Sequence, residues 1–129
     1  MDKLKVVNVV GAAIVDEDKI LCAQRGYGDL KGQWEFPGGK IEPGETGEQA
    51  IIREIKEELD VDICVLRYIT TSSYDYPTFH INLAIYEAVI TKGEIHDHEH
   101  TSLKWVKRSD MEKLNWCPAD VNIIKDVIK

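Results

Sequence analysis

Apolar and polar residues alternate along this chain with two different periods, and the change of period separates expected strands from expected helices. Residues 6–15 are almost wholly apolar or small, which is typical of a buried strand. Residues 19–25 alternate well enough to form the second strand of a hairpin. Three glycines in residues 26–32 predict a loop, and residues 34–36 form a short expected strand that Pro37 and the next two glycines end.

Further strands are expected in the second half of the chain. Residues 61–73 and 79–91 have the pattern of two strands joined by a turn over residues 74–78. A polar loop over residues 92–102 then leads to a short strand at residues 103–106. The chain therefore carries strands in both halves, with helical signals between and after them.

The strongest helical signal follows a turn at residues 42–45, where Pro and Gly occupy the two central positions that a type II turn prefers. Thr46 is the expected N-cap, and Gln49, three residues on, completes a capping box. The helix is expected to end near Leu59 or Asp60. Its apolar stripe at helical spacing consists of Ile51, Ile52, Ile55 and Leu59.

Two shorter helical segments are expected near the C-terminus. Ser109 is a candidate cap for a small helix over residues 110–114. Pro118 suits the first turn of a helix and is expected to begin the last one. Three apolar residues are expected on the inner face of that helix: Val121, Ile124 and Ile128.

Composition and charge narrow the class of protein. The 129 residues suit a single domain over residues 1–129, with 43% hydrophobic and 30% charged residues. The net charge of −7 argues against a nucleic-acid partner or an anionic membrane surface. No apolar run approaches the roughly 20 residues that span a bilayer, and the N-terminus lacks a signal-peptide pattern, so we expect a cytoplasmic protein.

The cysteines do not indicate a structural framework. Cys22, Cys64 and Cys117 are odd in number and form no CxxC pair. This pattern argues against a set of disulfides or a zinc knuckle. We therefore expect free thiols that are buried or half-buried.

Three glutamates on the predicted helix carry the first chemical signal. Glu54, Glu57 and Glu58 are spaced i, i+3 and i+4, so they share one face, where like charges repel. Two of them also lie in the last turns, where the helix dipole disfavours anions. Such a cluster suits a divalent cation that prefers oxygen ligands, although the helix alone is equally typical of a solvated acidic surface.

The residues around the helix favour the metal-binding interpretation. Gly38 and Gly39 allow backbone groups to approach a metal or a phosphate closely. Arg53 lies beside the carboxylates, and a pair between Arg53 and Glu45 would hold the preceding loop against the helix. Loop, turn and helix would then form one rigid unit that presents oxygen ligands.

The run Gly39-x5-Glu45-x7-Arg53-Glu54-Ile55-x-Glu57-Glu58-x-x-Val61 resembles the signature of the Nudix hydrolases. One position departs from it, because Asp60 stands where the signature has Gly. Asp tolerates the left-handed conformation better than most residues, so the helix end is expected to survive with some local strain. The Glu-Phe-Pro-Gly-Gly-Lys segment before the signature is similar to small MutT-type members, and the Trp116–Asp120 and His98–His100 segments are most similar to their CTP pyrophosphohydrolase branch.

This resemblance implies the Nudix fold, an α/β/α sandwich with a mixed, partly antiparallel sheet. It implies Mg²⁺-dependent hydrolysis of a nucleoside triphosphate to a monophosphate and pyrophosphate, with Mn²⁺ as an alternative ion. Arg53 and Glu45 would act as an orienting pair in the catalytic set. The implied metal ligands are the Gly38 carbonyl and the carboxylates of Glu54, Glu57, Glu58 and Glu99, of which the last is also a candidate general base.

Four residues are candidates for binding the substrate. Arg25 can clamp phosphate in a bidentate manner, with a plain surface arginine as the alternative. Lys40 can pair with phosphate or with a carboxylate of the signature. Asp120 matches a base-contacting position of MutT-type proteins, with a role in the first turn of the last helix as the alternative. Tyr76 is a candidate for stacking on a base, as are three residues that suit the core equally well: Tyr74, Phe79 and Trp116.

Several functions stay open at this point. A cytidine triphosphate, including a 5-modified one, is slightly favoured over an oxidised purine triphosphate such as 8-oxo-dGTP. A linked diphosphate such as ADP-ribose is a third alternative, and a nucleotide-binding regulator without turnover is an alternative of another class. We expect a monomer or homodimer without nucleic-acid or membrane partners. The alternating His96, His98 and His100 suit a solvated loop better than a second metal site.

Overall fold

The computed structural model describes residues 5–97 and 100–129, and in these residues seven strands form one mixed sheet. The strand order is β3-β2-β1-β6-β5, with β4 added to β1 and β7 added to β2. The central pair, β1 and β6, is parallel, whereas the other pairs are antiparallel. The strands are β1 (Lys5–Asp16), β2 (Lys19–Arg25), β3 (Trp34–Glu35), β4 (Gly38–Lys40), β5 (Asp62–Tyr76), β6 (Phe79–Lys92) and β7 (His100–Lys107).

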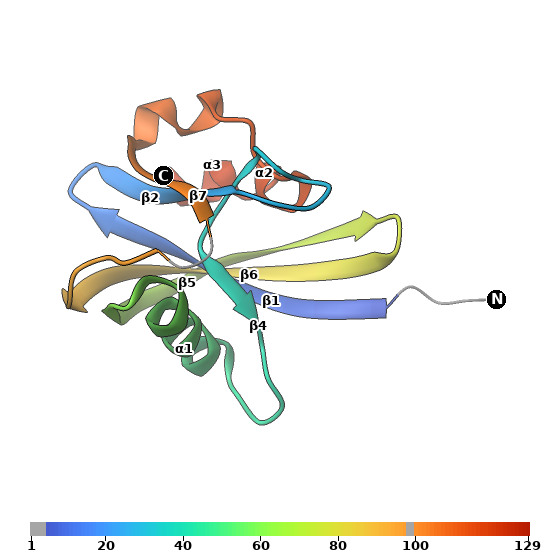
Figure 1. The fold of residues 1–129 in the computed structure, drawn as a ribbon, viewed down its shortest axis with the longest axis horizontal. Helices are drawn as coiled ribbons and strands as arrows, with labels where there is room; N and C mark the ends of the chain where they lie inside the picture. Colours follow the sequence, from blue (N-terminus) through green and yellow to red (C-terminus); the bar gives the residue numbers. More distant parts are fainter. Residues whose placement is uncertain (1–4, 98–99) are drawn as a thin grey trace.

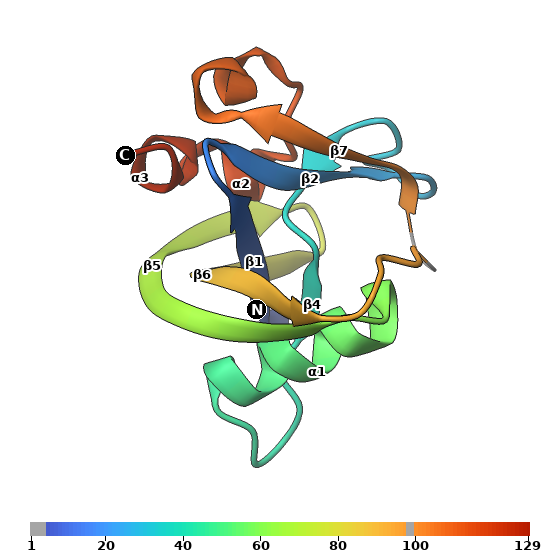
Figure 2. The same ribbon diagram turned by 90° about the vertical axis from the view of Figure 1, so that its left-hand side faces the viewer.

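Helices cover both faces of this sheet (Figures 1 and 2). The helix α1 (Gly47–Leu59) packs against β1, β4, β5 and β6 on one side. The two short helices α2 (Pro118–Val121) and α3 (Ile124–Val127) pack on the other side, with a 3₁₀ helix at Arg108–Lys113 above β2 and β7. This arrangement confirms the expected α/β/α sandwich with a mixed sheet.

Alternation along β1 divides the core into two parts. Val10, Ala12 and Ile14 face α1, while Ala13 faces the C-terminal helices. All four are at most 1% exposed. Since burying a side chain as large as that of Ile14 stabilises the fold by roughly 2 kcal/mol, both faces of the strand contribute to holding the helices on the sheet.

Helix α1 forms as its sequence predicts. Thr46 is the N-cap, and the capping box with Gln49 is complete in both directions. At the other end Asp60 adopts the left-handed conformation, with φ 62° and ψ 30°, and its N–H donates to the Lys56 carbonyl. The aspartate therefore replaces glycine at this helix end without shortening the helix, as expected.

The glycine pair differs from the prediction, because it does not end a strand but begins one. In β4, Gly38 pairs with Gly11 and Gly39 pairs with Val10 of β1. A Cβ at Gly38 would overlap the Val10 backbone carbonyl. The sequence indicated a break at these residues. Glycine has no side chain, however, so the backbones of β4 and β1 can lie unusually close here.

Two other strands are longer than predicted. The strand β5 continues to Tyr76, so only residues 77–78 turn the chain into β6. The strand β7 spans His100–Lys107 rather than residues 103–106, because it pairs with β2 along almost its whole length. Pairing with a distant strand thus extends both elements beyond their local apolar pattern.

The C-terminal helices also differ from the prediction. The segment Arg108–Lys113 is a 3₁₀ helix, and Ser109 does not cap it. The last helix is interrupted between α2 and α3, which brings the adjacent Ile123 and Ile124 both into the core. Val121 is 54% exposed and does not face inward, whereas Ile124 and Ile128 pack on the core as expected.

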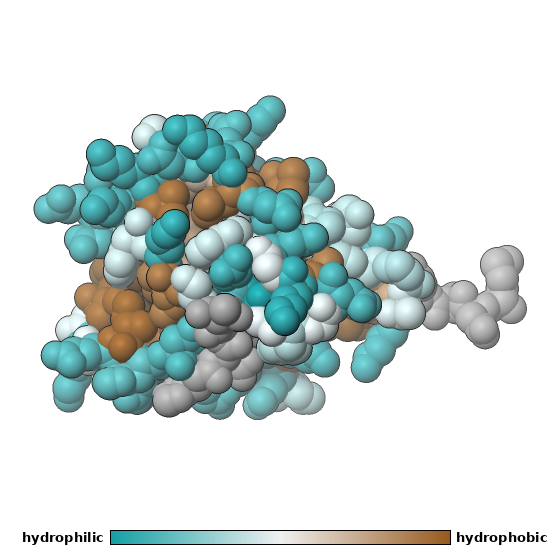
Figure 3. Space-filling model, turned by 45° about the horizontal axis from the view of Figure 1, so that its top comes forward, coloured by the Kyte–Doolittle hydropathy of each residue, from teal (hydrophilic) through white to brown (hydrophobic). Residues whose placement is uncertain are grey.

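The surface is mostly hydrophilic, with hydrophobic areas that are separated from one another on the face shown in Figure 3. Within the described residues no helix is both long and apolar enough to cross a membrane. All three cysteines are free, and Cys22 and Cys117 are buried as expected. Cys64 is exposed instead, because it lies on the outer side of β5.

Candidate active site

A cleft of about 820 Å³ lies between the glycine strand β4, helix α1 and the start of α2. Residues of two kinds line it. One group is polar and belongs to the segment that resembles the Nudix signature: Gly38, Gly39, Lys40, Glu42, Glu54 and Glu58. The other group is largely apolar and comes from the sheet and the C-terminal segment: Tyr76, Phe79, Ile81, Leu83, Ala119 and Asp120.

Arg53 connects the loop before α1 to the helix itself. Its Nε donates to Glu45 Oε2 at 2.7 Å, and its Nη2 donates to Glu45 Oε1 at 2.9 Å and to the Lys40 carbonyl at 3.0 Å. The hydrogen bonds from Arg53 hold the pKa of Glu45 down at about 2, and the same bonds raise the pKa of Arg53. The bidentate pair therefore fixes the loop that carries Lys40 and Glu45 against the helix.

The three box carboxylates have different surroundings. Glu54 Oε1 accepts from Arg53 Nη1 at 2.8 Å, and Glu58 Oε2 accepts from the Gly38 N–H at 3.1 Å. Glu58 is only 9% exposed, which is unusual for a glutamate. Glu57 also accepts from Arg53, at 3.3 Å, but its side chain is 60% exposed. Glu54 and Glu58 thus face the cleft, while Glu57 lies in solvent on the same helix.

Gly39 explains why the Glu54 carboxylate can lie against the β4 backbone. A Cβ at this residue would overlap all three heavy atoms of that carboxylate. Any side chain at residue 39 would therefore displace Glu54 from the cleft. The glycine pair thus allows two close contacts: Gly38 lies against the backbone of β1, and Gly39 lies against the Glu54 carboxylate.

The donor groups of the cleft suit a divalent cation that also binds the substrate. Across residues 5–97 and 100–129, no three His, Cys, Asp or Glu side chains are already gathered as a metal site. Mg²⁺, however, keeps several waters and is usually held by one or two carboxylates together with substrate phosphates. Glu54 and Glu58 beside Gly38 supply hard oxygen donors of this kind, so the residues fit the ion. Glu99 and His98 lie outside the described residues, as does the side chain of His100.

Asp120 is the buried acid of the cleft. It is 5% exposed, and its Oδ2 accepts from the Phe36 N–H at 3.3 Å. Burial raises the pKa of Asp120 well above its ordinary value of 3.8, and the negative charge of Glu35 raises it further. The Phe36 N–H and the charge of Arg25 act in the opposite direction but do not cancel the effect of burial.

Arg25 lies in the same cleft and is not a plain surface arginine. Its Nη1 donates to Glu35 Oε1 at 3.0 Å, and its guanidinium lies 5.2 Å from the centre of the Tyr27 ring. Burial lowers the pKa of Arg25, but the Glu35 carboxylate raises it by more. Its Nε is buried and has no hydrogen-bond partner among the described residues.

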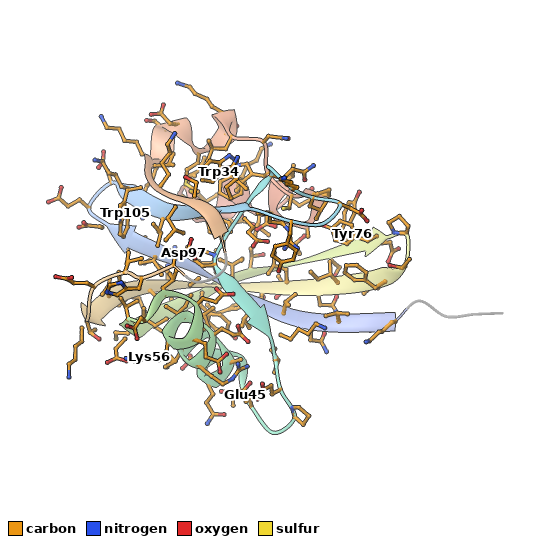
Figure 4. The ribbon with its side chains drawn as sticks, in the orientation of Figure 1. Trp34, Glu45, Lys56, Tyr76, Asp97 and Trp105 are labelled. Carbon is orange, nitrogen blue, oxygen red and sulfur yellow. The ribbon has the colours of Figure 1, made fainter. Side chains whose placement is uncertain are left out.

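Of the aromatic candidates, Tyr76 and Phe79 line the cleft. Their rings stack on each other with centroids 5.0 Å apart, and the Tyr76 hydroxyl accepts from the Ala119 N–H at 3.3 Å. Figure 4 shows Tyr76 on β5, far from Glu45 at the loop before α1. Trp116 instead stacks on Phe36 and is 6% exposed, and Tyr74 packs against the same core.

Glu35 is the cleft residue that the sequence interpretation missed. It is the last residue of β3 and pairs with Ala23 of β2, which makes it a diagonal neighbour of Arg25. Opposite charges at diagonal positions of two paired strands attract each other. That complementarity was the available signal, but it depends on knowing that β3 pairs with β2 in this register.

Comparisons with known proteins agree with this geometry. The model of the NUDIX domain matches residues 5–127, and the chain belongs to the Nudix family. It is 34% identical over 123 residues to the CTP pyrophosphohydrolase of Escherichia coli K12, covering 95% of this chain and 91% of that protein. It is 36% identical over 96 residues to the 8-oxo-dGTP diphosphatase of Proteus vulgaris, covering 74% and 86%.

A solved structure supports the same conclusion. The solution structure of the MutT protein, a Nudix hydrolase from methicillin-resistant Staphylococcus aureus 252, matches with a TM-score of 0.80 at 40% identity and covers 98% of both chains. The protein is therefore a MutT-like Nudix pyrophosphohydrolase. Nudix hydrolases generally use a divalent metal such as Mg²⁺, which agrees with the donor set in the cleft.

Proposed function

We propose that this enzyme hydrolyses a cytidine or deoxycytidine triphosphate, including 5-modified forms, to the monophosphate and pyrophosphate, using Mg²⁺ with Mn²⁺ as an alternative. The observation that carries the proposal is that one cleft combines a pair of acids for the metal with a third, separate acid for the base. Glu54 and Glu58 belong to its polar group, and Asp120 lies among its apolar residues. A triphosphate at the first group and a base at the second would place one nucleotide along the cleft.

The polar group is assigned to the reaction. Glu54, Glu58 and the Gly38 carbonyl would hold the metal, and Glu57 would join them by turning its exposed side chain toward the cleft. Glu99 is proposed as a further ligand or the general base. When bound, Mg²⁺ neutralises phosphate charge and makes a coordinated water easier to deprotonate. Arg53 holds Glu54 in place, and the bond from Gly38 to Glu58 keeps the second acid aimed at the cleft.

At the triphosphate end of the substrate, the protein must compensate the negative charge of the phosphates. The protein carries a net charge of −7, so the triphosphate needs local cations. Lys40 lines the cleft beside the glycine pair, and Arg25 lines it as a second cation. Both are proposed to contact phosphate oxygens. Water attack at the α- or the β-phosphorus then breaks the bond between that phosphorus and the bridging oxygen, which gives the monophosphate and pyrophosphate in either case.

Asp120 is proposed to select the base. With its raised pKa the carboxyl can stay protonated, and it then presents an O–H donor beside a carbonyl acceptor. Cytosine presents the matching pair, an N3 acceptor beside the N4 donor. Tyr76 and Phe79 supply the apolar surface on which the base would stack.

A second substrate, 8-oxo-dGTP, is favoured by the same protonated acid. 8-Oxoguanine presents the O6 acceptor beside an N7–H donor, a pair of the same kind, whereas unmodified guanine has acceptors at both O6 and N7. The similarity to an 8-oxo-dGTP diphosphatase agrees with this alternative. Cytidine stays the first choice because the relative named for CTP matches almost the whole chain.

A panel of substrates tests the proposal. The enzyme is incubated with Mg²⁺ and CTP, dCTP, 5-methyl-dCTP, dGTP, 8-oxo-dGTP, ATP or ADP-ribose, and kcat/KM is measured for each with product identification. The expected result is monophosphate and pyrophosphate, with a cytidine compound preferred. Preference for 8-oxo-dGTP would replace the first choice by the second, and absence of turnover with every compound would overturn the proposed function.

A further inference from the structure

Glu35 is a charged side chain of the cleft to which the proposed reaction assigns no role. It lines the cleft with a side chain that is 21% exposed, and it is paired with Arg25 at 3.0 Å. The strand β3 that carries it is only two residues long and is held on one side by β2. On the other side Trp34 forms a bridge to Trp116, in the segment that leads to Asp120. Glu35 is thus bonded to Arg25 and is adjacent in the chain to Phe36, whose N–H donates to Asp120.

The backbone beside Glu35 also holds Asp120 directly. The only hydrogen bond described for the Asp120 carboxyl comes from the N–H of Phe36, the residue after Glu35. A change in the position or charge of Glu35 is therefore transmitted to Asp120 in two ways, through the electric field and through this short segment of chain.

We infer that Glu35 is a positioning residue for base selection, because together with Arg25 it determines whether Asp120 offers the base a hydrogen-bond donor or only acceptors. The inference rests on the proposed function, since it concerns how the same cleft chooses its base. It concerns the residues of this chain alone and does not depend on the metal.

The groups that face Asp120 support this assignment. Three of them are neutral near pH 7, because burial raises the pKa of Cys22, Cys117 and Tyr76 to about 12 each. The charged groups that act on Asp120 within the described residues are Glu35 and Arg25. These two are bonded to each other, so the charge that Asp120 experiences depends on their balance.

The direction of the effect follows from that balance. Glu35→Gln removes a negative charge near Asp120 and leaves the positive charge of Arg25 uncompensated. Both changes favour the ionised form of Asp120. An ionised carboxylate has acceptors only, so it keeps the bond from cytosine N4 but loses the bond to cytosine N3. Because the Phe36 N–H donates to Oδ2, the proton of the neutral acid lies on Oδ1, where it meets the cytosine N3 acceptor but opposes the N3–H of uracil. Ionisation removes this opposition, so the ionised form keeps one hydrogen bond with either base.

The ratio of kcat/KM for CTP to that for UTP therefore reports the state of Asp120. Metal binding and the chemical step are common to the two substrates and cancel in the ratio. In the native enzyme the ratio is expected to fall as the pH rises through the raised pKa of Asp120 and the carboxyl ionises. In Glu35→Gln the fall is expected at a lower pH, because the negative charge that raises the pKa of Asp120 is gone. Glu35→Asp retains the charge and is expected to restore most of the native profile.

Asp120→Asn provides the control that separates this role from a structural one. An amide keeps a donor beside an acceptor but does not titrate in this range, so the ratio is expected to be independent of pH. Adding Glu35→Gln to Asp120→Asn should then leave the profile flat. A profile in Glu35→Gln that superimposes on the native one, or a shift that persists with Asn at residue 120, would overturn the inference.

A measurement without substrate keeps the inference separate from the proposed function. The carboxyl resonance of Asp120 is followed by carbon NMR as a function of pH in the native protein and in Glu35→Gln. A lower pKa in the variant supports the coupling even if no triphosphate is hydrolysed, which would count against the proposed function alone. An unchanged pKa would overturn the inference even if CTP is a good substrate.

Discussion

The Glu54 carboxylate occupies the space where a side chain at Gly39 would begin. This relationship joins the strand β4 to the helix α1 at the wall of the cleft. A substitution at residue 39 would therefore move one acid of the site, because the Glu54 carboxylate is the end of a flexible side chain and can shift without moving the backbone.

The first prediction compares the two glycines of β4. Gly39→Ala should push Glu54 aside, lower the affinity for Mg²⁺ and reduce turnover while changing the melting temperature little. Gly38→Ala should instead destabilise the protein, because its Cβ would overlap the backbone of β1, which cannot move independently. Calorimetric titration of metal and thermal unfolding distinguish the two. Equal loss of stability in both variants would contradict the account.

The second prediction concerns Glu58. Glu58→Gln removes a charge that the site needs but keeps an oxygen that can accept from the Gly38 N–H. Turnover should fall by roughly 10² or more with the fold intact, as judged by thermal unfolding. Glu48→Gln is the matched control, since Glu48 is an exposed acid on the same helix and does not line the cleft. Native turnover in Glu58→Gln would remove this residue from the metal-binding set.

The third prediction follows from the clamp between Arg53 and Glu45. The pKa of Glu45 is lowered from 4.5 to about 2 by Arg53, so its folded form binds the proton more weakly than its unfolded form. Its contribution to the free energy of unfolding is therefore present above pH 4.5 and is lost as the pH falls toward 2. Urea unfolding of native protein and Glu45→Gln across this range should converge at the acid end. A difference that stays constant down to pH 2 would show that the clamp is not electrostatic.

The fourth prediction has the opposite sign and concerns Asp120. Its pKa is raised on folding, so the folded state binds the proton more tightly and stability falls as the pH rises above the ordinary value of 3.8. Asp120→Asn removes this penalty. The variant should melt at a higher temperature than the native protein near neutral pH and at a similar temperature at acid pH. A variant that is less stable at neutral pH would mean that the carboxylate is satisfied by partners other than Phe36.

Features determined by neighbouring residues were predictable from the sequence. The capping box of Thr46 and Gln49 and the left-handed Asp60 depend on contacts within a few positions, and both formed as expected. The spacing of Glu54, Glu57 and Glu58 also placed them on one helical face. Their separation into two acids in the cleft and one in solvent depends on β4, which the local pattern indicated as a break.

Features determined by distant pairing were not predictable. The strand β4 exists because Gly38 and Gly39 meet β1, and β7 is long because β2 runs beside it. The place of Glu35 in the cleft likewise depends on the register of β3 on β2. In each case the decisive partner lies many residues away, where the period of apolar residues gives no information.

The most direct test of the central claim is to identify the products of CTP by phosphorus NMR, with Mg²⁺ and with a chelator in its place. The account predicts that CMP and pyrophosphate accumulate together, at equal rates, and only when the metal is present. Formation of CDP with orthophosphate, or an undiminished rate in the chelator, would contradict the assignment of the cleft as a metal-dependent pyrophosphohydrolase site.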